Sequence, residues 1–485
     1  MCGVIGVAGN ADAAREVFIG LMNLQHRGQD GAGILTTGAP GNSIFNLQHG
    51  SGLVENVFSE RAFKSLRGHT AIGHTRYATI GRKDPNLLQP FLDYEAGIGI
   101  GHNGNIVNCY ALADELISKE GVSPMRTNSD SEVILHLLAK YLKPGDHNAE
   151  NLFAGIKTVM GKLVGSYAVI GLDREGNLFG FRDPHGIRPL ELGKRVNGDG
   201  RATYALASET VALSYLGYTE ISEVKPGEAV WISSSGELKR QVLESQSYSP
   251  CMFEWVYFSR VESETGDLSI YQARFKLGVL LAEQLKERNI KADVVVPVPE
   301  TSRAAAIAIA ESMDLPFREL LIKNRYVNRT FILEDQESRQ EAIKRKLFPI
   351  AQEVAGKRCL VVDDSIVRGN TAKQIIELLR HAGAKEVILV STCPPIAHPC
   401  YYGIDFPSRA ELVACGHSDK DVAFELGADK VIYQTMDGLK NALNQRSLCT
   451  GCLTGEYPTD ISFGQEFETR RLNDRQKLTN QGANQ

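Results

Sequence analysis

The sequence has 485 residues, which exceeds what one ordinary hydrophobic core accommodates, so we expect two domains. Its hydrophobic fraction of 43% and charged fraction of 23% are typical of a globular protein and exclude a disordered or fibrous chain. The net charge of −5 indicates no nucleic-acid partner, because phosphates call for a basic surface, and no apolar run approaches the ~18 residues of a membrane-spanning helix.

The nine cysteines are an odd number in a chain long enough to fold without covalent cross-links, which argues against a secreted disulfide framework. No basic segment of a secretory signal separates Met1 from the glycine-rich apolar residues that follow it. We therefore expect a cytoplasmic protein without a membrane segment, whose cysteines are catalytic, metal-binding or buried in the core.

Short β-prone runs and frequent turns characterise residues 2–240, which we predict to form one domain. Examples of such runs are Ala71–Gly73, Gly97–Gly101 and Tyr167–Gly171. This pattern predicts antiparallel sheets with helices laid over them. The clearest helix is predicted over Ser131–Tyr141, where apolar residues recur at helical spacing. Capping groups precede it at Asn128, Ser129 and Asp130.

The pattern changes after the polar stretch Glu244–Pro250, and residues 250–460 are predicted to form a second domain. Here apolar strands alternate with amphipathic helices, which predicts a parallel sheet. The predicted strand and helix pairs are Asp293–Pro299 with Arg303–Met313, and Arg358–Val362 with Thr371–His381. The polar tail 464–485 lacks an apolar face, and we expect it to be frayed.

Cys2 becomes the N-terminal residue once Met1 is removed, and we expect maturation to need nothing more than that removal. A free α-amine has a pKa of ~7.7–8.0, so near neutrality it can act as the base for the thiol of its own residue. Taken alone, Cys2 is better explained as a small residue that begins a strand.

Four motifs change that interpretation, and together they resemble the class II glutamine amidotransferase family. They are Cys2–Gly6, His26–Gly33, Gly73–Tyr77 and Gly101–Asn105. The resemblance implies an N-terminal nucleophile fold, an αββα sandwich of antiparallel sheets, with Cys2 as the nucleophile that attacks the glutamine carboxamide.

The same resemblance assigns a role to each remaining polar residue of the motifs. The Asn103 side chain and the Gly104 N–H would stabilise the oxyanion, Arg76 would bind the substrate carboxylate, and Asp130 its ammonium group. Arg27 and Gly28 are the remaining residues implied to bind glutamine. Taken alone, Asp130 is a good helix cap and Asn103–Gly104 a good hairpin turn.

The most specific motif of the second domain is the run Cys359–Thr371, in which a buried strand ends in two carboxylates and a glycine-containing loop opens a helix. Backbone N–H groups at a helix N-terminus bind phosphate, and ligands of open α/β sheets bind at the carboxyl ends of strands. Asp363 and Asp364 therefore point to ribose hydroxyls and a magnesium ion. The plainer alternative is a strand-to-helix turn capped by acidic residues.

This run resembles the phosphoribosyl diphosphate loop of type I phosphoribosyltransferases. The residues implied to bind that substrate are Asp363, Asp364, Ser365, Val367, Arg368, Gly369, Asn370 and Thr371. A second strand end, Val296–Arg303, resembles another part of the site in glutamine phosphoribosyl diphosphate amidotransferases. It implies one magnesium ion per subunit, held by Thr301, Asp363 and Asp364.

Residues Lys323–Leu347 resemble the mobile loop of that family, which closes over the substrate and excludes water. Arg329 and Lys346 are implied to contact phosphoribosyl diphosphate. On charge alone the segment is a solvated basic stretch. It departs from the usual sequence of the family at Asn328 and in the acidic pair Glu334–Asp335.

Cys449 and Cys452 form a C-x-x-C pair, a spacing that suits zinc, an iron–sulfur centre or redox chemistry. Their surroundings, together with Pro250–Glu254 and His398–Asp405, resemble the iron–sulfur branch of the amidophosphoribosyltransferase family. That resemblance implies one [4Fe–4S] cluster per subunit, held by Cys251, Cys400, Cys449 and Cys452.

The resemblance covers residues 2–460 and implies release of ammonia from glutamine and its transfer to phosphoribosyl diphosphate, the opening step of purine synthesis. It further implies feedback inhibition by purine nucleotides and a homotetramer. The alternatives are a regulatory nucleotide sensor, a salvage phosphoribosyltransferase fused to a glutaminase, and another class II amidotransferase such as a hexosamine or asparagine synthase. The last would need a sugar-isomerase or adenylating motif, which the second half does not contain.

Overall fold

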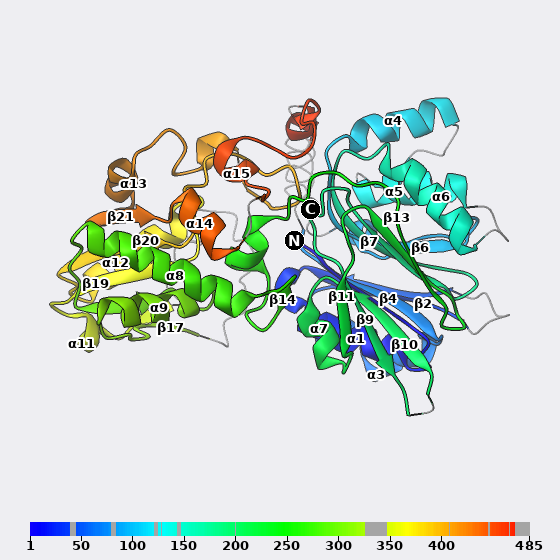
Figure 1. Ribbon diagram of the computed structural model, residues 1–485, viewed down its shortest axis with the longest axis horizontal. Coiled ribbons are helices and arrows are strands. Elements are labelled where there is room, and N and C mark those ends of the chain that lie inside the picture. The colour runs from blue at the N-terminus through cyan, green and yellow to red at the C-terminus, as the bar shows by residue number, and fades with distance from the viewer. Residues whose placement is uncertain are drawn as a thin grey trace, which may run out of the picture.

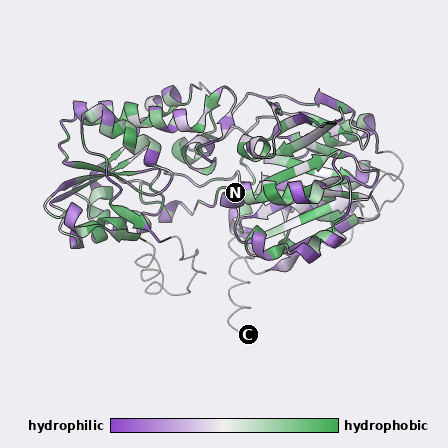
Figure 2. Cartoon of the chain, turned by 90° about the horizontal axis from the view of Figure 1, so that it is seen from below, coloured by the Kyte–Doolittle hydropathy of each residue, from purple (hydrophilic) through white to green (hydrophobic). Residues whose placement is uncertain are grey.

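The computed structural model describes residues 1–38, 45–78, 84–120, 125–127, 129–142, 147–198, 200–324, 347–406, 408–444, 447–464 and 466–470. These residues form two parts that lie side by side, with the N-terminus of the chain close to the junction (Figure 1). Figure 2 shows hydrophobic residues concentrated on the strands inside each part.

The N-terminal part contains two antiparallel sheets. The first has the order β11-β9-β10-β1-β4-β2-β3, and the second the order β13-β12-β8-β7-β6-β5. The strands of the first sheet are β1 (Gly3–Ala8), β2 (Gly31–Thr37), β3 (Phe45–Ser51), β4 (Thr70–Arg76), β9 (Glu191–Val196), β10 (Ala202–Ala207) and β11 (Glu220–Glu223). Those of the second are β5 (Phe91–Asp93), β6 (Ile98–Ile106), β7 (Gly165–Asp173), β8 (Leu178–Arg182), β12 (Glu228–Ile232) and β13 (Leu238–Val242).

Helices cover both outer faces of this pair of sheets. Between the sheets lies an aliphatic core to which both contribute, for example Val4 and Ile72 from the first and Ile170 and Val230 from the second. One outer face carries α1 (Ala13–Asn23) and α7 (Thr210–Tyr215), and the other carries α4 (Cys109–Glu120), α5 (Asp130–Tyr141) and α6 (Ala149–Met160). The predicted αββα sandwich is confirmed.

Helix α5 illustrates how the sequence directs this packing. Ser129 is its N-cap, and the Ser129 side chain accepts a hydrogen bond from the Ser131 N–H. Val133, Ile134, Leu137 and Leu138 face the sheet and are buried, as their helical spacing predicts. Asn128, the other expected capping residue, lies outside the described residues.

The second part is built on a parallel sheet with the order β16-β19-β20-β21. Its strands are β16 (Val294–Pro297), β19 (Arg358–Asp363), β20 (Glu386–Ser391) and β21 (Lys430–Tyr433). The helices around it are α8 (Ile270–Glu287), α9 (Arg303–Met313), α12 (Asn370–His381), α13 (Asp419–Leu426) and α14 (Met436–Ala442). Apolar clusters on both faces of the sheet confirm the predicted α/β architecture. The limits 2–240 and 250–460 stay predictions.

Part of the predicted polar tail is more ordered than we expected, while residues 471–485 lie outside the described residues. After α15 (Gly451–Thr454), residues 466–470 are helical, and Phe467 is buried with its ring 6.1 Å from that of Tyr110. Arg470 also pairs with Asp114 at 3.3 Å. The expectation of a frayed tail from 464 onward is therefore wrong for this stretch, because one aromatic residue anchors it.

Among the residues that the structure describes, no helix is both long and apolar enough to cross a membrane.

Candidate active site

The N-terminal residues are held by β1, which lies between β10 and β4 in the first sheet. The Gly3 N–H donates to Thr75 Oγ1 over 3.2 Å, and the Val4 N–H donates to Ser208 Oγ over 2.9 Å. These bonds fix the backbone immediately after Cys2, whose own side chain is half-buried. The backbone that carries the thiol is therefore held at the start of β1.

Asn103 on β6 lies directly against Cys2. The Cys2 N–H donates to Asn103 Oδ1 over 3.3 Å, and the Asn103 side chain is completely buried. Because Oδ1 accepts this bond, the Nδ2 group is left as a donor, and it has no hydrogen-bond partner within the described ranges. A buried, unsatisfied amide donor beside the thiol is what an oxyanion hole requires.

The backbone N–H of Gly104 points to the edge of β6 that faces away from β7. The N–H groups of a strand alternate between its two edges. The N–H of His102 donates to Gln89 Oε1 over 2.7 Å and that of Ile106 to Asp130 Oδ2 over 3.1 Å, so both point away from β7. Gly104 lies midway between them, and its N–H is directed to the same edge.

Asp130 and Arg76, the residues expected to bind the two charged groups of glutamine, lie near this strand end. Asp130 Oδ1 is 3.6 Å from His102 Nδ1, and His102 lowers the pKa of this carboxyl although burial alone would raise it. Arg76 ends β4, and burial lowers its pKa while the thiol of Cys2 opposes that shift. The two side chains expected to bind glutamine thus carry opposite charges.

Gly28 and Arg27 have different local roles. A Cβ on Gly28 would lie 2.5 Å from the carbonyl carbon of Arg76, so only glycine allows this approach. The Arg27 side chain is fully buried and donates to Glu209 and, over 2.7 Å, to Glu254. Its guanidinium is therefore occupied, and what Arg27 can offer glutamine is its backbone.

Arg27 belongs to a buried charge network that joins the two parts of the molecule. Glu254, at the start of a π-helix over Glu254–Phe258, accepts from Arg27 and also from Arg188 Nη1 over 3.2 Å. Burial alone would lower the pKa of Arg27, but Glu209 and Glu254 raise it above its usual value. The network thus keeps its charges by pairing them, as buried ions require.

The two carboxylates predicted to face phosphoribosyl diphosphate lie at the carboxyl end of β19. Asp363 and Asp364 are 8% and 7% exposed. Asp364 accepts from the hydroxyl of Thr301 and, over 2.7 Å, from that of Ser365. The structure therefore brings together Thr301, Asp363, Asp364 and Ser365, which the sequence placed in two separate motifs.

Burial raises the pKa of both carboxyls, and neighbouring groups then raise or lower each pKa further. The neighbouring Asp364 raises the pKa of Asp363 further, whereas Thr301, Ser365 and the buried Arg274 oppose the shift at Asp364. Two buried carboxyls that are costly to ionise fit a divalent cation, since Mg²⁺ prefers oxygen ligands and would replace the protons.

The loop from Ser365 leads into α12, whose N-cap is Gly369. Gly369 has a φ of +79°, and a Cβ there would lie 2.6 Å from Leu426 Cδ2. Arg368 is exposed and pairs with Glu411 at 3.3 Å, while the carbonyl of Val367 accepts from the Val413 N–H. The loop therefore presents the start of a helix, with Asn370 and Thr371 as its first residues, above the strand end.

The predicted mobile loop is described only at its ends. Lys323 and Leu347 belong to a two-stranded sheet of β17 (Leu321–Lys323) and β18 (Leu347–Pro349). Arg329, Lys346 and the variant positions Asn328 and Glu334–Asp335 lie outside the described residues.

The four predicted cluster ligands converge where the two parts meet. Cys251 and Cys449 form a parallel β-bridge, and Cys251, Cys449 and Cys452 are buried. All are free thiols, and burial together with the neighbouring thiols, Cys400 among them, raises the pKa of Cys449 and Cys452. A set of thiols that is hard to ionise alone fits a metal centre, which binds thiolates.

Several residues that complete these sites were given no role by the sequence analysis. Thr75, Ser208 and Gln89 hold the strands around Cys2, and Arg274 lies close to Asp364. Arg188 is fully buried beside the cysteines, where burial alone would lower its pKa but Cys251 and Glu254 raise it. Only Thr75 belongs to a stretch that the resemblance covered with a motif, so sequence patterns gave no signal for the others.

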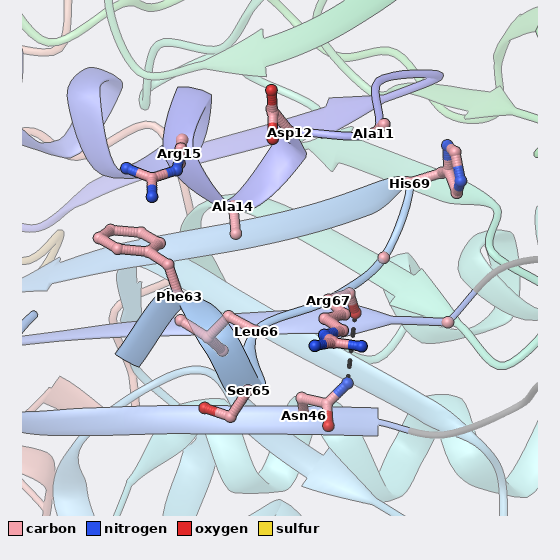
Figure 3. A pocket seen from close by; sticks show the side chains of 12 residues that line it. Ala11, Asp12, Ala14, Arg15, Asn46, Phe63, Ser65, Leu66, Arg67 and His69 are labelled. Atoms are coloured by element: carbon pink, nitrogen blue, oxygen red, sulfur yellow. Dashed lines mark hydrogen bonds between the residues drawn. The ribbon is translucent and has the colours of Figure 1, made fainter. Parts of the chain in front are cut away.

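One cavity, of about 560 Å³, lies away from these residues (Figure 3). It opens beside the start of α1 and α3 (Glu60–Ser65), and its lining includes Arg15, Phe63, Arg67 and His69. No predicted site residue lines this cavity.

Comparisons with known proteins cover both parts of the chain. Residues 74–215 match the glutamine amidotransferase domain and residues 267–404 the phosphoribosyl transferase domain. The amidophosphoribosyltransferase of Escherichia coli is 42% identical over 450 residues, which are 91% of this chain and 88% of the relative. That of Schizosaccharomyces pombe is 38% identical over 489 residues, 95% of this chain and 91% of the relative.

Among solved structures, glutamine phosphoribosylpyrophosphate amidotransferase from B. subtilis, complexed with ADP and GMP, matches with a TM-score of 0.83 and 39% identity over 95% of this chain and 98% of its own. A structure described as the allosteric regulatory enzyme of purine biosynthesis matches with a TM-score of 0.84 and 38% identity, covering 95% and 97%. With both domains matched and relatives this similar over almost its whole length, the chain belongs to the amidophosphoribosyltransferase family.

Proposed function

We propose that this enzyme hydrolyses glutamine at Cys2 and transfers the ammonia to 5-phosphoribosyl 1-diphosphate, yielding 5-phosphoribosylamine, glutamate and diphosphate. This is the first step of purine (IMP) synthesis. The observation that carries the proposal is the pairing of Cys2 with the unsatisfied amide of Asn103 in a chain that also holds two buried carboxylates at a strand end.

In the glutaminase step, the thiol of Cys2 loses its proton to the α-amine of the same residue and attacks the carboxamide carbon. The resulting oxyanion accepts hydrogen bonds from Asn103 Nδ2 and the Gly104 N–H. The amine then returns the proton to the departing ammonia, and water hydrolyses the thioester to glutamate and free thiol. A free α-amine has a pKa of ~7.7–8.0, so a useful fraction of the Cys2 amine is uncharged near neutrality once Met1 is removed.

In the transfer step, ammonia forms a bond to C1 of the ribose as the bond from C1 to diphosphate breaks. The loop Ser365–Thr371 binds the 5-phosphate, and the carboxylates orient the ribose hydroxyls. Thr301, Asp363 and Asp364 would hold magnesium, which when bound neutralises the departing diphosphate. We propose that ammonia passes internally between the sites, since in water near neutrality it would be protonated and unreactive.

We further propose that Cys251, Cys400, Cys449 and Cys452 hold one [4Fe–4S] cluster with a structural role. Tetrahedral zinc with Zn–S bonds of ~2.3 Å would bring the sulfurs within ~4 Å of one another. In the described residues, the one set of His, Cys or carboxylate side chains with three ligand atoms within 4.8 Å contains no cysteine. The wider spacing of the thiols supports a larger centre.

Metal analysis of anaerobically purified enzyme tests this assignment. We expect about four iron and four sulfide per chain, because the four thiolates meet the requirement of one cluster. Replacing Cys452 with serine is expected to lower the iron content, whereas Cys415→Ala, at a cysteine without an assigned role, is the matched control and should retain it. One zinc per chain in place of iron would refute the cluster.

The remaining expectations are also proposals. The B. subtilis relative was solved with ADP and GMP, which supports purine nucleotides as feedback inhibitors of this enzyme. We also propose a cytoplasmic homotetramer, and size measurements in solution would test the oligomeric state.

The reaction itself is tested by supplying glutamine, phosphoribosyl diphosphate and magnesium to the purified enzyme. Glutamate and diphosphate are expected to form in equal amounts, because the ammonia released at one site is consumed at the other. Omitting phosphoribosyl diphosphate is the control for uncoupled glutamine hydrolysis. Diphosphate that forms without any dependence on glutamine or ammonia would contradict the proposed reaction.

A further inference from the structure

The segment that follows Cys400 contacts the strand that carries the oxyanion hole. The Asn105 Nδ2 group donates to the Tyr401 carbonyl over 2.8 Å. The Ser166 hydroxyl, on the neighbouring strand β7, donates to the Tyr402 carbonyl over 3.0 Å. Asn105 pairs with Ser166 in the sheet, so both bonds hold the segment against the same point of β6 and β7.

Gly403 continues this contact onto Gly104 itself. Its φ is +96°, and a Cβ there would lie 2.8 Å from the Gly104 carbonyl oxygen and 3.0 Å from its carbonyl carbon. The backbone of the segment therefore packs directly on the peptide unit of a residue that supplies an oxyanion donor. A side chain at position 403 would have to push that peptide away.

On its other side, the segment is tied to the cysteine site. The Tyr402 N–H points at Cys400 Sγ, 3.3 Å away. The N–H groups of Ala397 and His398 both donate to the Cys452 carbonyl, at 3.1 and 3.0 Å. The Tyr402 hydroxyl lies 2.8 Å from Thr459 Oγ1. One face of the segment is thus fixed by the cysteines and the other by the glutaminase sheet.

Burial makes this connection stiff. Tyr402 is 1% exposed and Ser166 is completely buried, so water cannot replace the hydrogen bond between them. Protein interiors transmit small displacements rather than absorb them, because side chains are close-packed. A shift of the segment is therefore passed on to Gly104.

We infer that residues 400–403 form a positioning element for the oxyanion hole, with Tyr402 and Gly403 as positioning residues. The four-cysteine site is thereby connected to the oxyanion hole through this segment. The inference rests on the proposed glutaminase role of Cys2, Asn103 and Gly104. It adds a positioning function to the four-cysteine site, whose proposed role was structural.

A positioning role predicts a particular kinetic signature. The oxyanion exists only after the thiol has attacked, so misplacing its donors weakens the transition state and leaves ground-state binding of glutamine nearly unchanged. Loss of one such donor costs about 10²–10³-fold in kcat in other enzymes. A displaced donor should therefore lower kcat for glutamine, with little change in KM.

The decisive experiment compares Gly403→Ala with Gly416→Ala. Gly416 has a φ of +75°, and a Cβ there meets nothing within 4 Å, so alanine at this position also adopts a positive φ but makes no such contact. We expect Gly403→Ala to lower kcat for glutamine hydrolysis by at least about tenfold. Turnover with ammonia in place of glutamine should stay within about twofold, since no transition-state contact in the transfer site changes. Gly416→Ala should change neither activity.

Ser166→Ala provides a milder variant, because it removes only the hydroxyl that holds the Tyr402 carbonyl. It should lower the same kcat by a smaller factor, and Ser166→Thr, which keeps a hydroxyl, should restore part of it. Unchanged glutamine kcat in both Gly403→Ala and Ser166→Ala would overturn the inference. Equal loss of glutamine- and ammonia-dependent turnover would also overturn it. A wild-type enzyme active with ammonia but not with glutamine would instead refute the proposed glutaminase.

Discussion

Cys2→Ala enzyme is expected to lose glutamine-dependent diphosphate release by at least about 10⁴-fold, as enzymes do when their nucleophile is removed. Turnover with added ammonia should persist, because the thiol takes no part in the transfer step. The residues around Cys2 should keep their positions, since the strand is held by Thr75 and Ser208 through backbone N–H groups rather than through the thiol.

The measurement is diphosphate release with glutamine or with ammonia as nitrogen donor, in wild type and variant side by side. Cys415→Ala is the matched control, because Cys415 is a partly exposed free thiol without an assigned role. Its activity with either donor should equal that of wild type. If Cys2→Ala lost both activities to the same extent, the two sites would not be separable and the proposed division of labour would be wrong.

Asp364→Asn enzyme is expected to lose turnover with both nitrogen donors, by at least about 10²-fold. Asparagine keeps the shape of the side chain and can accept a hydrogen bond from Thr301 or Ser365, but it removes the charge that the cation and ribose site requires. Glutamine hydrolysis measured alone should remain, since Asp364 lies in the other part of the molecule.

Thermal stability separates this loss from unfolding. Burial raises the pKa of Asp364, so its ionised form is less favourable in the folded state than in the unfolded state. That penalty is absent when the carboxyl is protonated and grows as the pH rises above its unfolded pKa. Near neutrality Asp364→Asn should therefore melt no lower than wild type in the absence of magnesium. Asp437→Asn, an exposed position on α14, is the control; a large fall in Tm for Asp364→Asn alone would contradict the argument.

Elements with a strong local pattern were predictable from the sequence. The helix expected over Arg303–Met313 has those same bounds, and the strand and helix expected at Arg358–Val362 and Thr371–His381 are each one residue longer. In each case the apolar spacing and the flanking glycine or acidic residues act within a few residues. Local physics therefore sufficed.

Local propensity misled at Asn103–Gly104, which taken alone resembles a hairpin turn. These residues lie inside β6, because the whole strand from Ile98 to Ile106 pairs with β7. Nine consecutive pairings outweigh the turn preference of two residues. The family resemblance, by using four motifs at once, avoided that error.

Contacts between distant residues left no trace in the sequence pattern. Arg27 finds Glu254 at a separation of 227 residues, and no periodicity or spacing connects them. The same is true of Gly403 and Gly104, where the informative quantity is the space available for a Cβ. Such pairs appear only after the chain has folded, which is why the sequence motifs gave the candidate catalytic residues but not the residues that hold them in place.

The charge network around Glu254 has a consequence for anyone who wishes to dissect this enzyme. A fragment ending near Val242 would keep Arg27 and Arg188 but lose Glu254, which accepts from Arg27 over 2.7 Å and from Arg188 over 3.2 Å. The complementary fragment would keep Glu254 without either arginine. We therefore expect either part, made alone, to be less stable than the same residues in the whole chain, because each has lost its partners in this ion-pair network.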